Sequence, residues 1–166
     1  MIKNILLTAA MTLFFLQTTW ASLGPRFESL NKKTGHYEKN GFFAGGTKEV
    51  TSAALSDVRR AKSNEGFERI VFDVTAQSDS LPYFQVQLSS AENRIVVSFW
   101  ADVQYEYNAA KVAKAFSKSA FVKKINILPR VEEGLSMVEI TMNPQSKAKA
   151  EVFTLSNPNR LIIDIL

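Results

Sequence analysis

The sequence predicts an all-β fold, a small β-sandwich of two sheets with one short amphipathic helix. Eight short segments alternate apolar and polar residues with a period of two, the pattern of a strand that buries one face. Turn-forming stretches such as NEG, AEN and NPQS separate them at regular spacing, which is typical of a sandwich. The expected strands span residues 53–61, 67–75, 83–89, 93–102, 122–128, 136–142, 148–155 and 160–166.

One segment departs from this period and predicts the helix. Residues 108–120, NAAKVAKAFSKSA, place Val112, Phe116 and Ala120 on one stripe of a helix. Three lysines fall on the opposite stripe, and Asn108 is suited to the N-cap position. The helix should therefore cover part of the β core.

Residues 1–21 have the pattern of a signal peptide. Lys3 precedes an apolar run, and the small residues Thr19 and Ala21 stand where a signal peptidase selects its site. We expect cleavage after Ala21 and a periplasmic mature protein. The apolar run is shorter than the ~20 residues of a membrane-spanning helix, so no stable membrane span is expected after cleavage. An uncleaved anchor is the alternative.

Residues 22–46 predict a flexible N-terminal arm, because glycine and asparagine interrupt every possible period. The arm also carries bulky apolar residues, which leaves open a short docking segment that orders on binding. His36 lies here as the only histidine of the chain, and a histidine without an orienting partner is expected to be solvated. The β domain should then span residues 47–166.

A signature recurs three times, as ERIVFDV at residues 68–74, NRIVVSF at residues 93–99 and NRLIIDI at residues 159–165. Because side chains alternate faces along a strand, Ile70, Phe72 and Val74 should point into the core. The charged residues of the three copies should share the outer faces: Arg69, Asp73, Arg94, Arg160 and Asp164. We expect cross-strand charge pairs here, and the alternative is a ligand site on the outer face.

The ordered series of segments from ERIVFDV to the closing NPNRLIIDIL resembles the AMIN domain, over residues 50–166. That family occurs N-terminal to periplasmic cell-wall amidases and in pilus secretins. The resemblance implies a sandwich of two small β-sheets that binds peptidoglycan and targets an attached machine to the cell wall. Neither an amidase domain nor secretin modules follow the signature in this sequence, so we expect a stand-alone copy.

The composition argues against most catalytic chemistry. A chain with no cysteine and one histidine lacks the usual ligands of a zinc amidase, and its β domain lacks the base of a serine hydrolase. We therefore expect no enzymatic activity, no metal and no cofactor. The formal charge is +4, or +3 once Lys3 leaves with the signal peptide, which is too small to indicate a nucleic acid partner.

Two non-catalytic functions remain. The first is an exported cell-envelope module that binds peptidoglycan, whose peptide carboxylates suit a mildly basic protein. The alternative is a protein-interaction accessory of an envelope machine, such as a type IV pilus or secretin complex. Such an accessory would dock a partner through an open sheet edge or through the arm.

The stretch FWADVQYEYNAAK, residues 99–111, is the candidate wall-binding segment. Its aromatic side chains, which can stack on sugar rings, precede the predicted helix. The lysines of that helix can pair with carboxylates. The candidate residues are Trp100, Tyr105, Tyr107, Lys111, Lys114 and Lys118. The alternative is that Trp100 packs beneath the helix and that the lysines only keep the helix soluble.

Overall fold

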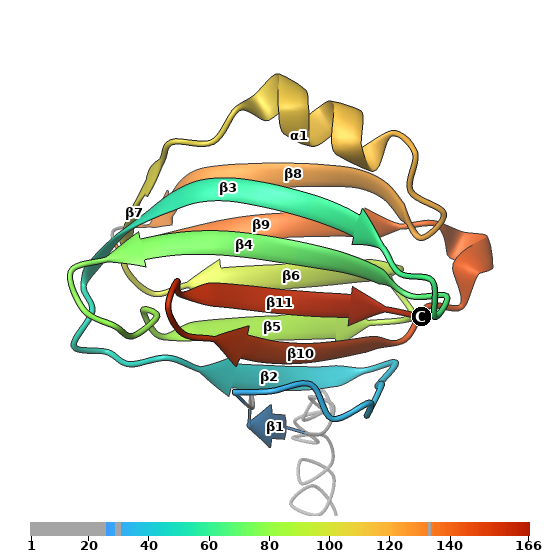
Figure 1. Cartoon of the computed structure of the whole chain (residues 1–166), viewed down its shortest axis with the longest axis horizontal. Coiled ribbons are helices and arrows are strands. Elements are labelled where there is room, and N and C mark those ends of the chain that lie inside the picture. The colour runs from blue at the N-terminus through green and yellow to red at the C-terminus, as the bar shows by residue number, and fades with distance from the viewer. Residues whose placement is uncertain (1–25, 29–30, 133) are drawn as a thin grey trace, which may run out of the picture.

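A computed structural model describes residues 26–28, 31–132 and 134–166, and it confirms the β-sandwich with one short helix. The predicted signal peptide, residues 1–21, lies outside the described residues. Two sheets pack face to face, and the helix lies along one side of them (Figure 1). All eight expected strands are present, and six of them differ from expectation by at most two residues at either end. The strand expected over 93–102 is shorter, and the strand expected over 122–128 extends to Glu132.

The first sheet has the order β1-β2-β5-β6-β9-β8. Five of these strands form an antiparallel array, and the three-residue β1 pairs with β2 in parallel. The strands are β1 (Arg26–Glu28), β2 (Gly41–Gly45), β5 (Phe84–Ser89), β6 (Arg94–Phe99), β8 (Val122–Glu132) and β9 (Leu135–Met142).

The second sheet has the order β10-β11-β4-β3-β7. Its strands are β3 (Ser52–Lys62), β4 (Glu68–Ala76), β7 (Asp102–Tyr105), β10 (Ala150–Leu155) and β11 (Arg160–Ile165). All neighbours are antiparallel except β3 and β7, which run parallel. The chain enters this sheet twice before β10, first through β3 and β4 and then through β7.

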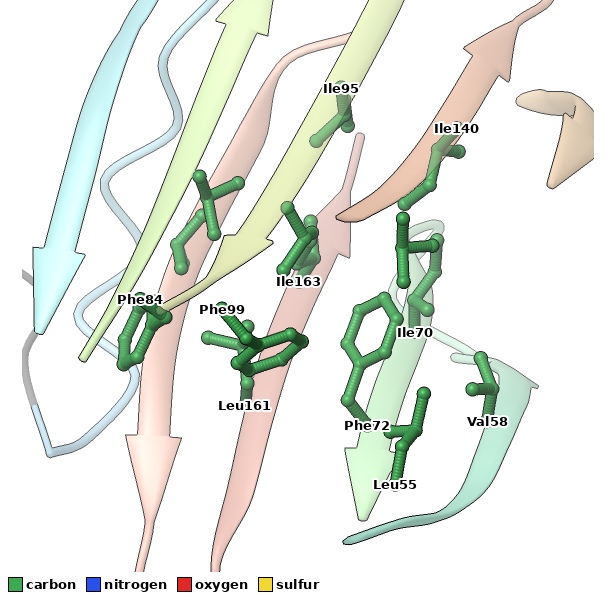
Figure 2. Close-up of a cluster of buried hydrophobic side chains, with 14 of the residues drawn as sticks. Leu55, Val58, Ile70, Phe72, Phe84, Ile95, Phe99, Ile140, Leu161 and Ile163 are labelled. Atoms are coloured by element: carbon green, nitrogen blue, oxygen red, sulfur yellow. The ribbon is translucent and has the colours of Figure 1, made fainter. Parts of the chain in front are cut away.

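The core lies between the sheets and follows the predicted alternation. Ile70, Phe72 and Val74 of the first signature are buried together. The rings of Phe72 and Phe84 each lie 6.5 Å from the ring of Phe99, between centroids (Figure 2). Burial of one such side chain stabilises the fold by roughly 1.5–3 kcal/mol, so this apolar layer is the main force that holds the sheets together.

Helix α1 (Ala109–Phe116) is shorter than the expected 108–120 but keeps the expected orientation. The Asn108 side chain accepts a hydrogen bond from the Lys111 amide at 3.0 Å, and Val112 and Phe116 are buried. Ala120 is exposed and lies beyond the end of the helix, so it does not belong to the buried stripe that Val112 and Phe116 form. The helix packs on β3 and β8 and covers the open side between the sheets (Figure 1). No helix in the described ranges has the length and apolarity to cross a membrane.

The expected strand over residues 93–102 is wrong at its end. Strand β6 stops at Phe99, and the chain then crosses to the other sheet, where β7 begins at Asp102. The Asp102 amide donates to the Thr51 carbonyl at 2.9 Å, ahead of the parallel pairing of β7 with β3. A sequence period of two continues across this crossover, which is why the pattern merged two strands into one.

The prediction of a separate flexible arm is corrected for residues 31–46, because these residues are part of the sandwich. Strand β2 pairs with β5 in antiparallel register, and Phe43 is buried in the core. Glu38 forms a bridge with Ala150 at the edge of the other sheet. Of the glycines that suggested a linker, Gly41 and Gly45 belong to strand β2, while Gly35 and Gly46 have positive φ values of 81° and 72°. The domain therefore begins well before residue 47. Residues 22–25 and 29–30 lie outside the described part of the chain.

Candidate functional site

An open hollow lies beside Trp100, on the outer side of the first sheet. Its lining residues are Lys48, Tyr83, Gln85, Trp100 and Gly134, and its volume is about 480 Å³. The Trp100 amide donates to the Tyr83 carbonyl at 2.9 Å, which sets the two aromatic residues side by side just beyond the paired Phe84 and Phe99. Trp100 is 48% exposed, the largest exposed fraction among the big apolar side chains of the described residues.

Polar groups surround this aromatic pair. The Gln85 side-chain amide donates to the Tyr83 hydroxyl at 3.0 Å, and the Lys48 ammonium lies 5.7 Å from the centroid of the Tyr83 ring. The hollow therefore combines an exposed apolar ring face, hydroxyl and amide groups, and a positive charge. Such a combination can hold a ligand that has both an apolar face, to stack on the aromatic ring, and polar or anionic groups at its edge.

The structure does not bring the other predicted wall-binding residues to Trp100. The Tyr105 and Tyr107 rings pack edge to face, with centroids 6.0 Å apart, and both are half-buried against the core. Burial raises the pKa of both hydroxyls. Neither tyrosine lines the hollow, so the sequence segment 99–111 is split between two places.

The helix lysines also stand apart from the hollow. Lys111, Lys114 and Lys118 are exposed, and none of them lines the Trp100 surface. The Lys111 ammonium pairs with Asp57 of β3 at 2.6 Å, which ties the helix to the second sheet. The expected alternative for Trp100, packing beneath the helix, is wrong because its ring is exposed to solvent.

The repeated signature is explained by the pairing of β4 with β11. These strands are antiparallel, with Arg69 opposite Asp164 and Asp73 opposite Arg160. An Arg followed by an Asp four residues later thus meets an Asp and an Arg on its neighbour, in reversed order. The predicted cross-strand charge pairs are confirmed for these two copies.

The two charge pairs differ in their surroundings. Asp164 has no exposed surface, and Arg69 donates to both of its oxygens at 2.6 and 2.8 Å. Asp73 is partly exposed and accepts from Arg160 at 3.0 Å and from Arg59 at 2.6 and 2.8 Å. Burial alone would raise the pKa of Asp73, but the hydrogen bonds from the two arginines outweigh burial and lower it. These arginines are already paired with carboxylates, which leaves them few free donors for a ligand.

The third copy of the signature lies in the other sheet. Arg94 of β6 pairs with Glu92 and, at 3.2 Å, with Glu139 of β9. It therefore shares neither a strand pair nor a face with Arg69 and Arg160. The hydrogen bond that Arg94 donates to Glu139 is the main cause that raises the pKa of its guanidinium.

The buried carboxylate of Glu68 was not predicted from the sequence. Glu68, only 2% exposed, accepts hydrogen bonds from Arg60 at 2.6 and 2.7 Å and from the Ala120 amide at 2.9 Å. Ser119 also donates to it, so the residues that follow the helix are tied to β4. Burial would raise the pKa of Glu68, but these donors outweigh burial and lower it. An acidic residue at a strand start looks like a solvated terminus in sequence, so no signal revealed this role.

The partners of Trp100 were only partly detectable. The hairpin turn between residues 83–89 and 93–102 was predicted, and its register places Tyr83 next to Trp100. Lys48 and Gly134 reach the hollow through tertiary structure, and no local pattern indicates them.

Within the described residues, no group of three or more His, Asp or Glu side chains is arranged to hold a metal ion. Comparison of the chain with protein-family models, curated proteins and solved structures finds no match.

Proposed function

We propose that this protein is a non-catalytic, exported module of the cell envelope that binds peptidoglycan in the periplasm. The observation that carries the proposal is the hollow formed by Trp100, Tyr83, Gln85 and Lys48. The resemblance of residues 50–166 to the AMIN domain supports the same ligand.

The chemistry of the hollow matches that of the cell wall. Peptidoglycan consists of amide-bearing sugar rings and short peptides with free carboxylates. The exposed face of Trp100 offers a stacking surface for a sugar ring, and Gln85 and Tyr83 offer donors and acceptors to its hydroxyl and amide groups. Lys48 supplies the positive charge for a nearby carboxylate.

The alternative is a protein-interaction accessory of an envelope machine such as a pilus or secretin complex. Strand β8 favours this alternative, because β8 is an edge strand of the six-stranded sheet and carries the exposed Leu128. A partner strand that paired with β8 would use the strand-addition mode of recognition.

Co-sedimentation with purified sacculi distinguishes the two functions. We expect the mature protein to pellet with sacculi, Trp100→Ala to lose most of this retention, and Leu128→Ala to keep it. Both substitutions truncate an exposed apolar side chain, so Leu128→Ala is a matched control for Trp100→Ala. Unchanged retention of Trp100→Ala, or loss of retention in Leu128→Ala alone, would contradict a wall site at Trp100.

A further inference from the structure

A second hollow opens at the other end of β6 from Trp100. It has a volume of about 220 Å³ and lies between the β5–β6 turn, residues 38–39 and the chain that follows the short 3-10 helix η1 (Pro144–Ser146). Residues 38–39 precede β2, so the segment expected to be a free arm builds one wall of this cavity. None of the residues that the sequence pattern marks as candidate binding residues lies here.

The floor of the cavity is apolar. Leu88, Ile95 and Met142 come from three neighbouring strands of the first sheet, and each is at most 5% exposed. The floor is therefore an edge of the sandwich core, of which a small apolar area faces the cavity. A ligand that covers it must present small apolar groups, since the cavity is smaller than the ~300–1,000 Å³ of drug-sized sites.

The rim of the cavity is positively charged. Lys39, Lys147 and Lys149 line it and are exposed. Glu38 is the one carboxylate among the lining residues, and its oxygen lies 2.7 Å from the His36 ring. Three cations against one anion leave a local excess of positive charge, which attracts an anionic ligand.

The backbone around the cavity is left-handed at two positions, and of these Lys147 is the strained one, because asparagine adopts this conformation readily. Asn93 and Lys147 both line it, and they have φ values of 49° and 47°, in the left-handed region. A lysine in this region is strained, because its Cβ lies too close to the backbone, whereas a glycine would avoid the strain. Strain of this kind concentrates at ligand sites, where the surrounding structure holds the residue in place.

We infer that this cavity binds the carboxylate end of a short peptide with small apolar side chains, and that in the cell this peptide is the stem of peptidoglycan. The lysines pair with the terminal carboxylate while methyl side chains cover the floor of Leu88, Ile95 and Met142. The assignment to a stem peptide rests on the proposed function. The protein then contacts the wall at two places, with sugar at Trp100 and peptide at the opposite end of β6.

Titration of the ¹⁵N-labelled mature protein with N-acetyl-D-alanyl-D-alanine, followed by NMR, tests the inference. We expect saturable shifts of the backbone amides of Asn93, Lys147 and Ala148. The same dipeptide with its terminus converted to an amide should bind about tenfold more weakly or worse, since a hydrogen bond to a charged group contributes roughly 1.5–3 kcal/mol. Equal binding of acid and amide, or no shift at these residues, overturns the site.

Two variants and a matched control locate the binding. Replacement of Lys39, Lys147 and Lys149 by Gln removes the charged rim, and replacement of Lys111, Lys114 and Lys118 by Gln removes the same charge from the helix. Only the replacement of the rim lysines should weaken binding of the dipeptide, by about tenfold or more. Ala148→Trp should block the cavity without changing charge. Equal weakening by both triple variants, or full binding to Ala148→Trp, rejects the cavity.

The source of the peptide and the wall function are tested separately. Equal affinity for N-acetyl-L-alanyl-L-alanine would retain a carboxylate site but overturn its assignment to the stem peptide. If the dipeptide binds at the cavity while sacculi retain no protein, the proposed function fails and the peptide site stands. If sacculi retain the protein through Trp100 but the dipeptide never binds, the cavity inference fails alone.

Discussion

The Arg69 guanidinium donates two hydrogen bonds to the carboxylate of Asp164, a residue with no exposed surface on the outer side of the second sheet. Lys33 approaches the same carboxylate at 3.2 Å from the segment before β2. The Arg69 guanidinium also lies 5.4 and 5.3 Å from the ring centroids of Phe67 and Phe153. The charge pair is thus enclosed by aromatic rings and by the N-terminal segment.

This enclosure predicts different costs for the same substitution in two copies of the signature. Arg69→Ala leaves the buried Asp164 with Lys33 as its remaining cation and should destabilise the protein by about 3 kcal/mol. Arg160→Ala leaves Asp73 paired with Arg59 and should cost about 1 kcal/mol or less. Urea denaturation of both variants measures the difference. Equal costs would show that burial of Asp164 has no energetic consequence.

The lowered pKa of Glu68 predicts how stability depends on pH. Because the folded pKa lies below the ordinary value of 4.5, the carboxylate contributes its full stabilisation above pH 4.5 and loses it as pH falls toward the folded value. Glu68→Gln should be less stable than the wild type at neutral pH, and the gap should narrow as the pH falls below that value. Thermal unfolding of both proteins from neutral to strongly acidic pH measures this gap. A gap that is constant with pH would contradict the role assigned to Glu68.

The junction between β2 and β3 predicts a strong effect at Gly46. A Cβ at this position would lie 2.2 Å from the Pro82 carbonyl oxygen, and φ is +72°. Gly46→Ala should therefore cost more than ~2 kcal/mol, since both backbone strain and a steric clash oppose it. Gly66 has φ +92°, but a Cβ there would meet no atom within 4 Å, so Gly66→Ala should cost about 1 kcal/mol. Similar melting temperatures for the two variants would argue against docking of the N-terminal segment as described.

Much of the fold was accessible from local pattern. Alternation in ERIVFDV and NRLIIDI indicates which residues enter the core, and the structure buries Ile70 and Ile163 as that pattern requires. The N-cap Asn108 and the buried Phe116 likewise follow from the helical period. These features depend on neighbours in sequence, which is why they were predicted correctly.

The errors concern contacts between distant segments. Glycine and asparagine in residues 31–46 indicate turns, but no local signal shows that Phe43 joins the core or that the Thr34 hydroxyl and the Gly35 amide donate to the buried Glu151. The assignment of Trp100 to the same site as Tyr107 assumed that residues close in sequence stay close in space. The crossover between β6 and β7 separates them, and Tyr83, from another strand region, becomes the neighbour instead.

Export is tested by the N-terminus of the protein recovered from cells. The charged residue Lys3, the apolar run and Ala21 predict a mature chain that begins at Ser22 in the periplasmic fraction. N-terminal sequencing or intact mass measures this directly. An intact Met1 on protein from the cytoplasm would contradict export and, with it, access to the cell wall.

Fluorescence of Trp100 tests the wall site most directly. Trp20 lies within the predicted signal peptide, so the mature chain keeps Trp100 as its single tryptophan, and its emission reports the hollow alone. Titration with soluble glycan fragments released from sacculi should shift this emission to shorter wavelength in a saturable way, because a stacked sugar removes water from the exposed ring. If sacculi retain the protein but the emission of Trp100 stays unchanged at the same protein and wall concentrations, binding of peptidoglycan at Trp100 is contradicted.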